Sequence, residues 1–177
     1  MAKPAKHLTP EQLQNRRDRM RERHQRYLDA YLGYQRIDWR KRFLMSIGPV
    51  LAGMEKIADS LAEATPPGPN REALVALLRK ALADDRAALM TRIEADAEEV
   101  THVLREQIER YWGRFGGPLN GWRVAHLQDP ALRQREQAEF AARMAEYTER
   151  ADAADEAEQT LRQAAYQQRL AELSGGE

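Results

Sequence analysis

Arginine side chains are concentrated near the N-terminus, in the segment 16–42. A planar guanidinium group can bond two phosphate oxygens at once, and several such contacts give strongly salt-dependent binding of polyanions. Asp18, Glu22 and Asp29 lie among the arginines and weaken their field. The alternative is a solvated helix whose arginines pair locally or with the acidic C-terminal helix. The candidate residues for binding a nucleic acid (DNA or RNA) or another polyanion are Arg16, Arg17, Arg19, Arg23, Arg26, Arg36, Arg40, Lys41 and Arg42.

Large aromatic side chains and arginines are dense among the glycines of the segment 112–129. One interpretation is that the aromatic rings cap the open end of a helical bundle. The other is a recognition tip, because aromatic and Arg side chains dominate binding hot spots and loops on rigid scaffolds carry function. The candidate protein-binding residues are Trp112, Phe115, Trp122 and Arg123, together with Tyr27, Tyr31 and Tyr34 of the basic segment.

Glu99 and His102 have the Glu-x-x-His spacing that places a carboxylate and an imidazole on one helical face, as in di-iron bundles. Such a site needs a second motif, and none of His7, His24 and His126 has a Glu three residues before it. Two further glutamates flank His102 at four-residue spacing, which more simply makes an exposed charged face. We therefore expect no metal and no cofactor, and keep Glu99 and His102 as weak candidate ligands.

A catalytic constellation is not visible in the sequence. The three serines do not lie beside a histidine or in a strand-to-helix elbow, and the glycines form no nucleotide-binding motif. The chain has no cysteine, which excludes disulfides, thiolate zinc sites and cysteine nucleophiles. We expect a protein that is not an enzyme. The missing cysteine also fits a reducing compartment, so we expect a cytoplasmic protein.

The 177 residues suit a single domain, 1–177. Much of the hydrophobic content is alanine, so we expect a thin core. Amphipathic helices draw most of their stability from packing, and an incomplete apolar stripe is often completed by another copy or another protein. We therefore expect protein partners and a homo-oligomer. The longest apolar run, 43–54, is too short to span a bilayer, so we expect no transmembrane segment.

The formal net charge of zero hides a gradient along the chain. Residues 1–42 carry 12 Lys and Arg against 5 Asp and Glu, whereas residues 127–177 carry 6 against 11. The segment between them, 43–126, is close to balance, with 10 against 12. Such asymmetry indicates either a basic arm for a polyanion or head-to-tail charge pairing within a bundle or oligomer.

A first helix is predicted over about 10–64. Thr9 is a hydroxyl N-cap, Pro10 occupies the first helical position, and Gln12 is placed to complete a capping box. An apolar face at helical spacing then continues to the end of this range.

Gly48 and Pro49 interrupt the first helical pattern. A proline within a helix lacks the backbone donor and clashes with the preceding turn, so we expect a kink near residue 48 or a short break there. The proline-rich segment 65–70 is predicted to be a loop, with Asn70 as the N-cap of the next helix.

A second helix is predicted over about 71–112. Its apolar residues recur at an eleven-residue interval, which keeps the stripe nearly straight along the helix. The residues at the eleven-residue interval are Leu78, Leu89, Val100 and Tyr111.

A Gly/aromatic loop is predicted over 113–129.

A third helix is predicted over about 130–173, with Asp129 as its cap. Its middle, 151–157, has no large side chain, so we expect this stretch to be either tightly paired or mobile. Residues 174–177 are predicted to be a disordered tail.

The predicted fold is all-α, with three long amphipathic helices in an elongated bundle or coiled-coil-like arrangement. Long faces without catalytic residues favour a non-enzymatic assembly or adaptor protein that binds other protein chains in a larger complex. The alternative is a nucleic-acid-binding protein that uses the basic N-terminal helix on phosphates, and a minor alternative is a metal-binding helical bundle.

Overall fold

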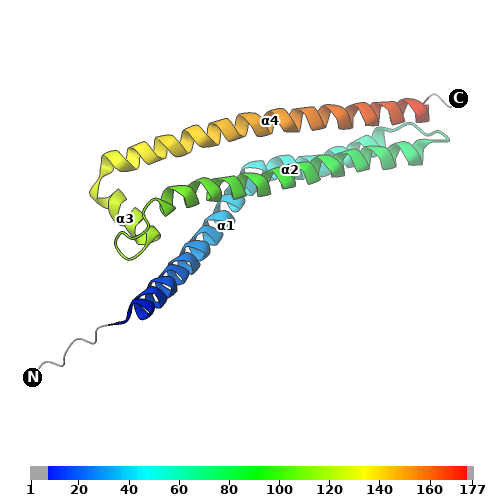
Figure 1. Cartoon of the computed structure of the whole chain (residues 1–177). Coiled ribbons are helices and arrows are strands. Elements are labelled where there is room, and N and C mark those ends of the chain that lie inside the picture. Colours follow the sequence, from blue (N-terminus) through cyan, green and yellow to red (C-terminus); the bar gives the residue numbers. More distant parts are fainter. Residues whose placement is uncertain (1–7, 175–177) are drawn as a thin grey trace, which may run out of the picture. The chain divides into compact units, whose positions relative to one another are not determined.

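The computed structural model describes residues 8–174, and all regular secondary structure in that range is helical. The all-α prediction is therefore confirmed. The predicted number of helices is wrong, because residues 8–174 form four helices and not three. They are α1 (Pro10–Ala64), α2 (Arg71–Glu109), α3 (Pro118–Gln128) and α4 (Pro130–Ser174) (Figure 1).

The start of α1 has the predicted capping box. The Thr9 N–H donates to Gln12 Oε1 at 3.0 Å, and the Gln12 N–H donates to Thr9 Oγ1 at 3.2 Å. Two backbone donors that a helix leaves without a partner are thereby satisfied.

Helix α1 continues through Gly48 and Pro49, so the short break predicted there is wrong. Pro49 removes only the bond to the carbonyl of Met45. Met45 is 80% exposed and lies on the solvent side of α1. The Ser46 hydroxyl also donates to the Phe43 carbonyl at 2.7 Å. The kink itself stays a prediction.

The segment predicted as a loop over 113–129 contains a helix, which is a correction to the sequence analysis. Helix α3 begins at Pro118, whose fixed φ suits a first turn, and follows Gly117 at φ 121°. Helix α2 ends at Glu109, three residues before the predicted end at 112. Hydrogen bonds across three residues replace those across four at this end: the N–H of Tyr111 donates to the Ile108 carbonyl at 3.0 Å.

Helix α4 starts at the predicted cap, since the Leu132 N–H donates to Asp129 Oδ1 at 3.0 Å. It ends at Ser174, so the predicted tail over 174–177 is wrong for Ser174, and residues 175–177 lie outside the described range. Asn70 precedes α2 as predicted, but its side chain donates to the Leu173 carbonyl at 2.8 Å. The last turn of α4 has few partners of its own, and this bond satisfies one of its carbonyls.

The chain divides into two compact units. Among the described residues, unit 1 comprises 8–36 and 101–141, and unit 2 comprises 37–100 and 142–174. Unit 1 contains all of α3, while each of the other helices contributes to both units. The single-domain organisation stays a prediction.

Unit 1 has a small apolar core. Leu28 and Leu32 of α1 are buried against Ile108 of α2. Tyr31, Leu104, Leu119 and Trp122 are half-buried around these three side chains. Asp29 of α1 also pairs with Arg105 of α2 at 2.6 Å, which joins the same two helices at the surface.

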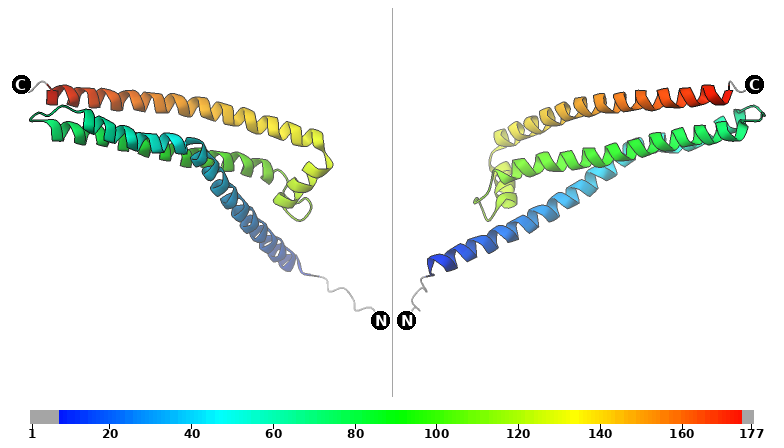
Figure 2. Two further views of the ribbon diagram at one scale, coloured as in Figure 1. Left: turned by 180° about the vertical axis from the view of Figure 1, so that it is seen from behind. Right: turned by 45° about the vertical axis from the view of Figure 1, so that its right-hand side comes forward.

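Ion pairs join the α1, α2 and α4 parts of unit 2. Arg40 pairs with Glu94, and Arg86 with Glu55, which sets α1 antiparallel to α2. Figure 2 shows α4 running beside α2, and the contacts at the two ends of unit 2 agree. Its buried apolar residues, Ile93, Ala97 and Val100, all come from α2.

The alanine-rich middle of α4 lies in unit 2. Every residue from 152 to 161 is exposed. Asp152 and Asp155 of this stretch nevertheless pair with Arg92 of α2. The choice between tight pairing and mobility stays a prediction. Across residues 8–174, no helix is long and apolar enough to cross a membrane.

Candidate protein-binding surface

A buried carboxylate, Glu136 of α4, joins three elements of unit 1. It is only 6% exposed. Its Oε1 accepts a hydrogen bond from the Tyr111 hydroxyl, and its Oε2 accepts one from Trp122 Nε1 at 3.1 Å and is bonded to His126 Nε2. The backbone carbonyl of Glu136 accepts a bond from Gln107 Nε2 at 2.9 Å. We call these five residues the Glu136 node.

The Glu136 node holds its side chains in defined positions because each donor has a buried acceptor. A buried polar group without a partner costs about 1 to 3 kcal/mol, so a satisfied network specifies one arrangement. Burial raises the pKa of Tyr111 to about 12, and the hydrogen bond to Glu136 and the charge of Glu136 act in the same direction. The phenol therefore remains protonated and donates to the carboxylate at neutral pH.

An ion pair at the surface supports the node. Arg110 donates to both carboxylate oxygens of Glu139, with Nη1 to Oε2 at 2.7 Å. The hydrogen bonds to Glu139 raise the pKa of Arg110, while burial acts against them. This two-pronged pair joins the turn after α2 to the first part of α4.

The node positions the short loop 113–117 between α2 and α3. Gly113, Gly116 and Gly117 have positive φ angles of 78°, 79° and 121°. A Cβ atom on Gly117 would lie 2.7 Å from His24 Cγ, so only glycine lets this backbone approach α1 so closely. Phe115, at φ 45°, is 60% exposed at the tip of the loop.

The predicted aromatic residues of this region have different surroundings. Trp122 is half-buried against the apolar core and the Glu136 node. Trp112 is half-buried beside His24 of α1, with ring centroids 6.1 Å apart. Phe115 instead faces solvent. The capping interpretation thus fits the environment of Trp122, and the tip interpretation fits that of Phe115.

A groove with a volume of about 710 Å³ lies between the first part of α1 and the turn that follows α2. We call residues 10–26 of α1 the α1 arm, and this groove the Trp112 groove. Its apolar walls are Leu13 and Met20 of the arm and Trp112 opposite them. The other residues of the lining are Gln14, Arg16, Arg17, Asp18, Arg21, His24 and Gly113.

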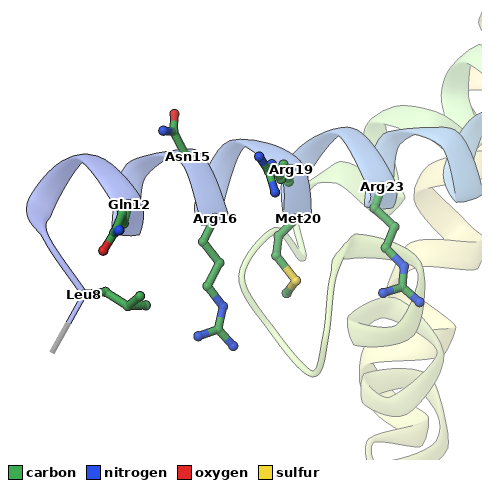
Figure 3. A pocket seen from close by; sticks show the side chains of 7 residues that line it. All are labelled: Leu8, Gln12, Asn15, Arg16, Arg19, Met20 and Arg23. Atoms are coloured by element: carbon green, nitrogen blue, oxygen red, sulfur yellow. The ribbon is translucent and has the colours of Figure 1, made fainter. Parts of the chain in front are cut away.

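A second hollow, of about 490 Å³, runs along the α1 arm itself. Figure 3 shows Arg16, Met20 and Arg23 projecting from the same side of the helix. The arm thus combines cationic side chains with an apolar one along a single face. The remaining lining residues are Leu8, Gln12, Asn15 and Arg19.

The predicted tyrosines Tyr27 and Tyr31 meet the loop in a pocket of about 320 Å³. Arg123 of α3 lies over the Tyr31 ring, 5.1 Å from its centroid. Burial raises the pKa of Tyr31, and Arg123 acts in the opposite direction. Tyr34 does not join this pocket and is 66% exposed.

The predicted polyanion-binding residues fall into two groups. Those of the α1 arm are exposed, and Arg23 alone of them has a ring contact, 5.7 Å from the Tyr27 centroid. The others of this group make no ion pair with any residue in the range 8–174; they are Arg16, Arg17, Arg19 and Arg26.

The later predicted cations are engaged within the chain. Arg40 pairs with Glu94, and Arg42 pairs with Asp38 at 2.7 Å and lies over the Trp39 ring at 5.2 Å. Arg36 also has an interaction partner, and Lys41 is exposed. Local pairing, the alternative to phosphate binding, thus describes Arg40 and Arg42.

The weak metal candidates do not form a ligand cluster. His102 lies in unit 1, where its Nε2 is 3.3 Å from Glu106 Oε1, and Glu99 belongs to unit 2. In the part of the chain that the structure describes, no group of three His, Cys, Asp or Glu side chains could hold a metal ion.

Sequence reasoning missed the Glu136 node. The signal was present in the apolar row of α4, where Leu132 and Phe140 are eight residues apart and Glu136 occupies the position midway between them. A carboxylate that is four residues from an apolar residue on either side lies on the apolar face of the helix. It is therefore a candidate for burial with hydrogen-bond partners. Its partners Gln107, Tyr111 and His126 could not be found in this way, because they come from other elements.

Comparison of the chain with protein-family models, with curated proteins and with solved structures gave no match.

Proposed function

We propose that this chain is a non-enzymatic helical assembly or adaptor protein that binds other protein chains. The α1 arm and the Trp112 groove form the binding surface. The observation that most supports this proposal is the exposure of Leu13 and Met20, 43% and 45%, in one groove with Trp112 and several arginines. Large apolar and aromatic anchors beside arginine are the composition of protein-binding hot spots.

The exposure of the arm also argues for a partner. All residues from 8 to 23 are exposed, so this part of α1 receives little packing energy from its own unit. Helices in proteins are stabilised chiefly by covering an apolar face. A partner that covers Leu13 and Met20 would supply that stabilisation.

The proposal keeps the remaining expectations from the sequence. The protein is assigned to the cytoplasm, because a chain without cysteine suits a reducing compartment. An elongated, coiled-coil-like and oligomeric arrangement belongs to the same proposal, supported by a core in which only eight apolar residues of the described range are buried.

A photo-crosslinking amino acid at Met20 tests the binding surface. Met45, on the same helix but in unit 2, is the matched control, because it is more exposed, at 80% against 45%. We expect a protein adduct, identified by mass spectrometry, at Met20 and not at Met45.

Binding to the identified partner is then measured with the purified full-length chain. Met20→Asp places a charge in the groove and should weaken binding by about tenfold or more, whereas Met45→Asp should leave it unchanged. If adducts form equally at both methionines, or if neither substitution changes the affinity, the proposed surface is wrong.

Nucleic-acid binding through the α1 arm is the second candidate function. It is favoured by Arg16, Arg17, Arg19 and Arg26, which make no ion pair within residues 8–174. Phosphates could therefore be bound without breaking existing pairs, and each neutralised phosphate would contribute to the salt dependence.

A retardation assay at increasing salt concentration tests this second candidate. The expected result is affinity at low salt that falls steeply as salt rises. Substitution of Arg16, Arg19, Arg23 and Arg26 by Gln should abolish binding while the helix content stays unchanged. If the wild-type chain does not retard DNA or RNA even at the lowest salt, the nucleic-acid candidate is rejected.

A further inference from the structure

Two helical stretches of the chain are lined by exposed residues. In unit 1, every residue from 8 to 23 is exposed, and in unit 2 every residue from 152 to 161 is exposed. Because amphipathic helices are stabilised mainly by packing, each stretch is a surface on which another helix can pack.

The two stretches carry opposite charge. The α1 arm contains six arginines against three acidic residues. Residues 146–158 of α4, which we call the α4 acidic stretch, contain six acidic residues against the single Arg150. Charge complementarity of this kind steers two surfaces together and fixes their register.

The spacing of the charges also corresponds. Arg16, Arg19, Arg23 and Arg26 are separated by steps of three, four and three residues. Positions 146, 149, 153 and 156 of α4 have the same steps and carry Glu, Glu, Ala and Glu. Both sets therefore form one stripe along a helix, with the same intervals along its axis.

The three glutamates of this α4 stripe are available for a partner. Glu146, Glu149 and Glu156 are exposed and make no ion pair with another residue between 8 and 174. Asp152 and Asp155, by contrast, are already paired with Arg92. The stripe thus offers three unpaired carboxylates to the arginines of an arm.

We infer that the α1 arm of one copy docks antiparallel on the α4 acidic stretch of a second copy. In this register Arg26, Arg23 and Arg16 face Glu146, Glu149 and Glu156, respectively. The antiparallel direction is chosen because it also brings Leu13 towards Leu161, which is 73% exposed, and Met20 towards the small side chains near Ala153. Alanine there permits close approach of the two helices.

This inference rests on the proposed function, since it names the partner of the proposed binding surface as another copy of the same chain. The contact is heterologous, because the arm and the α4 acidic stretch are different surfaces. After one such contact, the first copy still has an unused acidic stretch and the second an unused arm, so further copies can add and the contact forms a ring or a linear chain of copies.

Charge exchange between two full-length variants tests the contact. The arm variant carries Arg16→Glu, Arg23→Glu and Arg26→Glu, and the face variant carries Glu146→Arg, Glu149→Arg and Glu156→Arg. Molar mass is measured by light scattering at low ionic strength, and helix content by circular dichroism. A matched control carries Arg133→Glu and Arg135→Glu, which reverse exposed cations outside the arm.

The wild type and the control are expected to associate, and each charge variant alone is expected to associate at least about tenfold more weakly, because like charges then face each other. An equimolar mixture of the two variants should associate as the wild type does, since every arm in the mixture can find a stretch of opposite charge. If association is restored only in the mixture, the arm of one copy must contact the acidic stretch of another.

A monomeric wild-type chain at low ionic strength would overturn the self-association, as would a mixture of variants that stays monomeric. Variants that associate as strongly as the wild type would show that another surface is used, which also overturns it. Neither result rejects the proposed function, because the crosslink at Met20 then identifies a different protein. If the wild type is monomeric and the arm variant loses affinity for DNA or RNA, the occupant of the arm is a nucleic acid.

Discussion

The two units use polar side chains in opposite ways. In unit 1, the carboxylate of Glu136 is buried and joins Tyr111, which follows α2, to Trp122 and His126 of α3. In unit 2, the contacts of Arg92 reach Asp152 and Asp155, whose side chains are 67% and 55% exposed. Burial strengthens a hydrogen bond and makes an unpaired group costly, whereas exposed pairs compete with water and salt.

This difference has a consequence for what each unit can do. A buried, satisfied network fixes one arrangement of the loop beside the α1 arm, which suits a surface that must be complementary to a partner. In unit 2, the middle of α4 is exposed beside its ion pairs. Such a surface suits a helix on which another helix can pack.

Replacing Glu136 by Ala should destabilise unit 1 strongly. The change leaves the buried hydroxyl of Tyr111 and the ring N–H of Trp122 without acceptors, for which we expect a loss of about 3 to 5 kcal/mol. Hydrogen exchange of the full chain, read by mass spectrometry, should speed up in α3 by about 100-fold or more.

Glu146→Ala is the control for this prediction, because Glu146 is an exposed carboxylate on the same helix. Its effect should stay within about 0.5 kcal/mol. If Glu136→Ala changes exchange in α3 as little as Glu146→Ala does, the buried node does not stabilise unit 1 and the contrast between the units fails.

The helix starts could be predicted from the sequence because capping is local. Thr9 bonds Gln12, and Asp129 bonds Leu132, in each case across three residues. The proline-rich loop before α2 was predicted correctly for a similar reason, since proline restricts its own backbone and that of its neighbour.

Helix α3 and the Glu136 node could not be predicted in the same way. The glycines around α3 favour a loop locally, yet Gly121 lies inside α3 because a Cβ there would come within 3.0 Å of the Tyr111 and Arg114 carbonyls. Close packing with a distant turn therefore outweighs the local preference. The node likewise depends on which helices meet, and Glu136 alone marks only one of its members.

Tyr111 should make the stability of unit 1 depend on pH in the alkaline range. Its pKa is raised from 10.0 to about 12. The folded state therefore holds the proton of this phenol more tightly than the unfolded chain does. The resulting stabilisation is fully present below pH 10 and is lost as the pH rises from 10 to about 12. We expect a loss of about 2 kcal/mol over this interval, measured by urea unfolding with circular dichroism.

Tyr111→Phe is the matched control for the pH dependence, because it removes the titrating hydroxyl and keeps the ring. The variant should start from a lower stability and should lack this part of the alkaline loss. If the wild type and Tyr111→Phe lose stability in parallel between pH 10 and 12, another group is responsible and the phenol is not held protonated by the node.

Arg92→Ala should have the smallest effect, although Arg92 bonds three carboxylates. Its partners are Asp96 at 2.7 Å, Asp152 at 2.9 Å and Asp155. Because Asp152 and Asp155 are largely exposed, we expect a loss of about 1 kcal/mol, which shrinks as salt screens the pairs. Hydrogen exchange in the segment 146–161 of α4 should then rise by less than about tenfold, against 100-fold or more for Glu136→Ala in α3.

Arg150→Ala, which removes an exposed arginine of the same stretch, is the control. The Arg92 side chain is itself only 16% exposed. A loss for Arg92→Ala as large as that for Glu136→Ala, and insensitive to salt, would therefore mean that the exposure of its partners does not weaken these pairs, and the contrast between the two units would no longer stand.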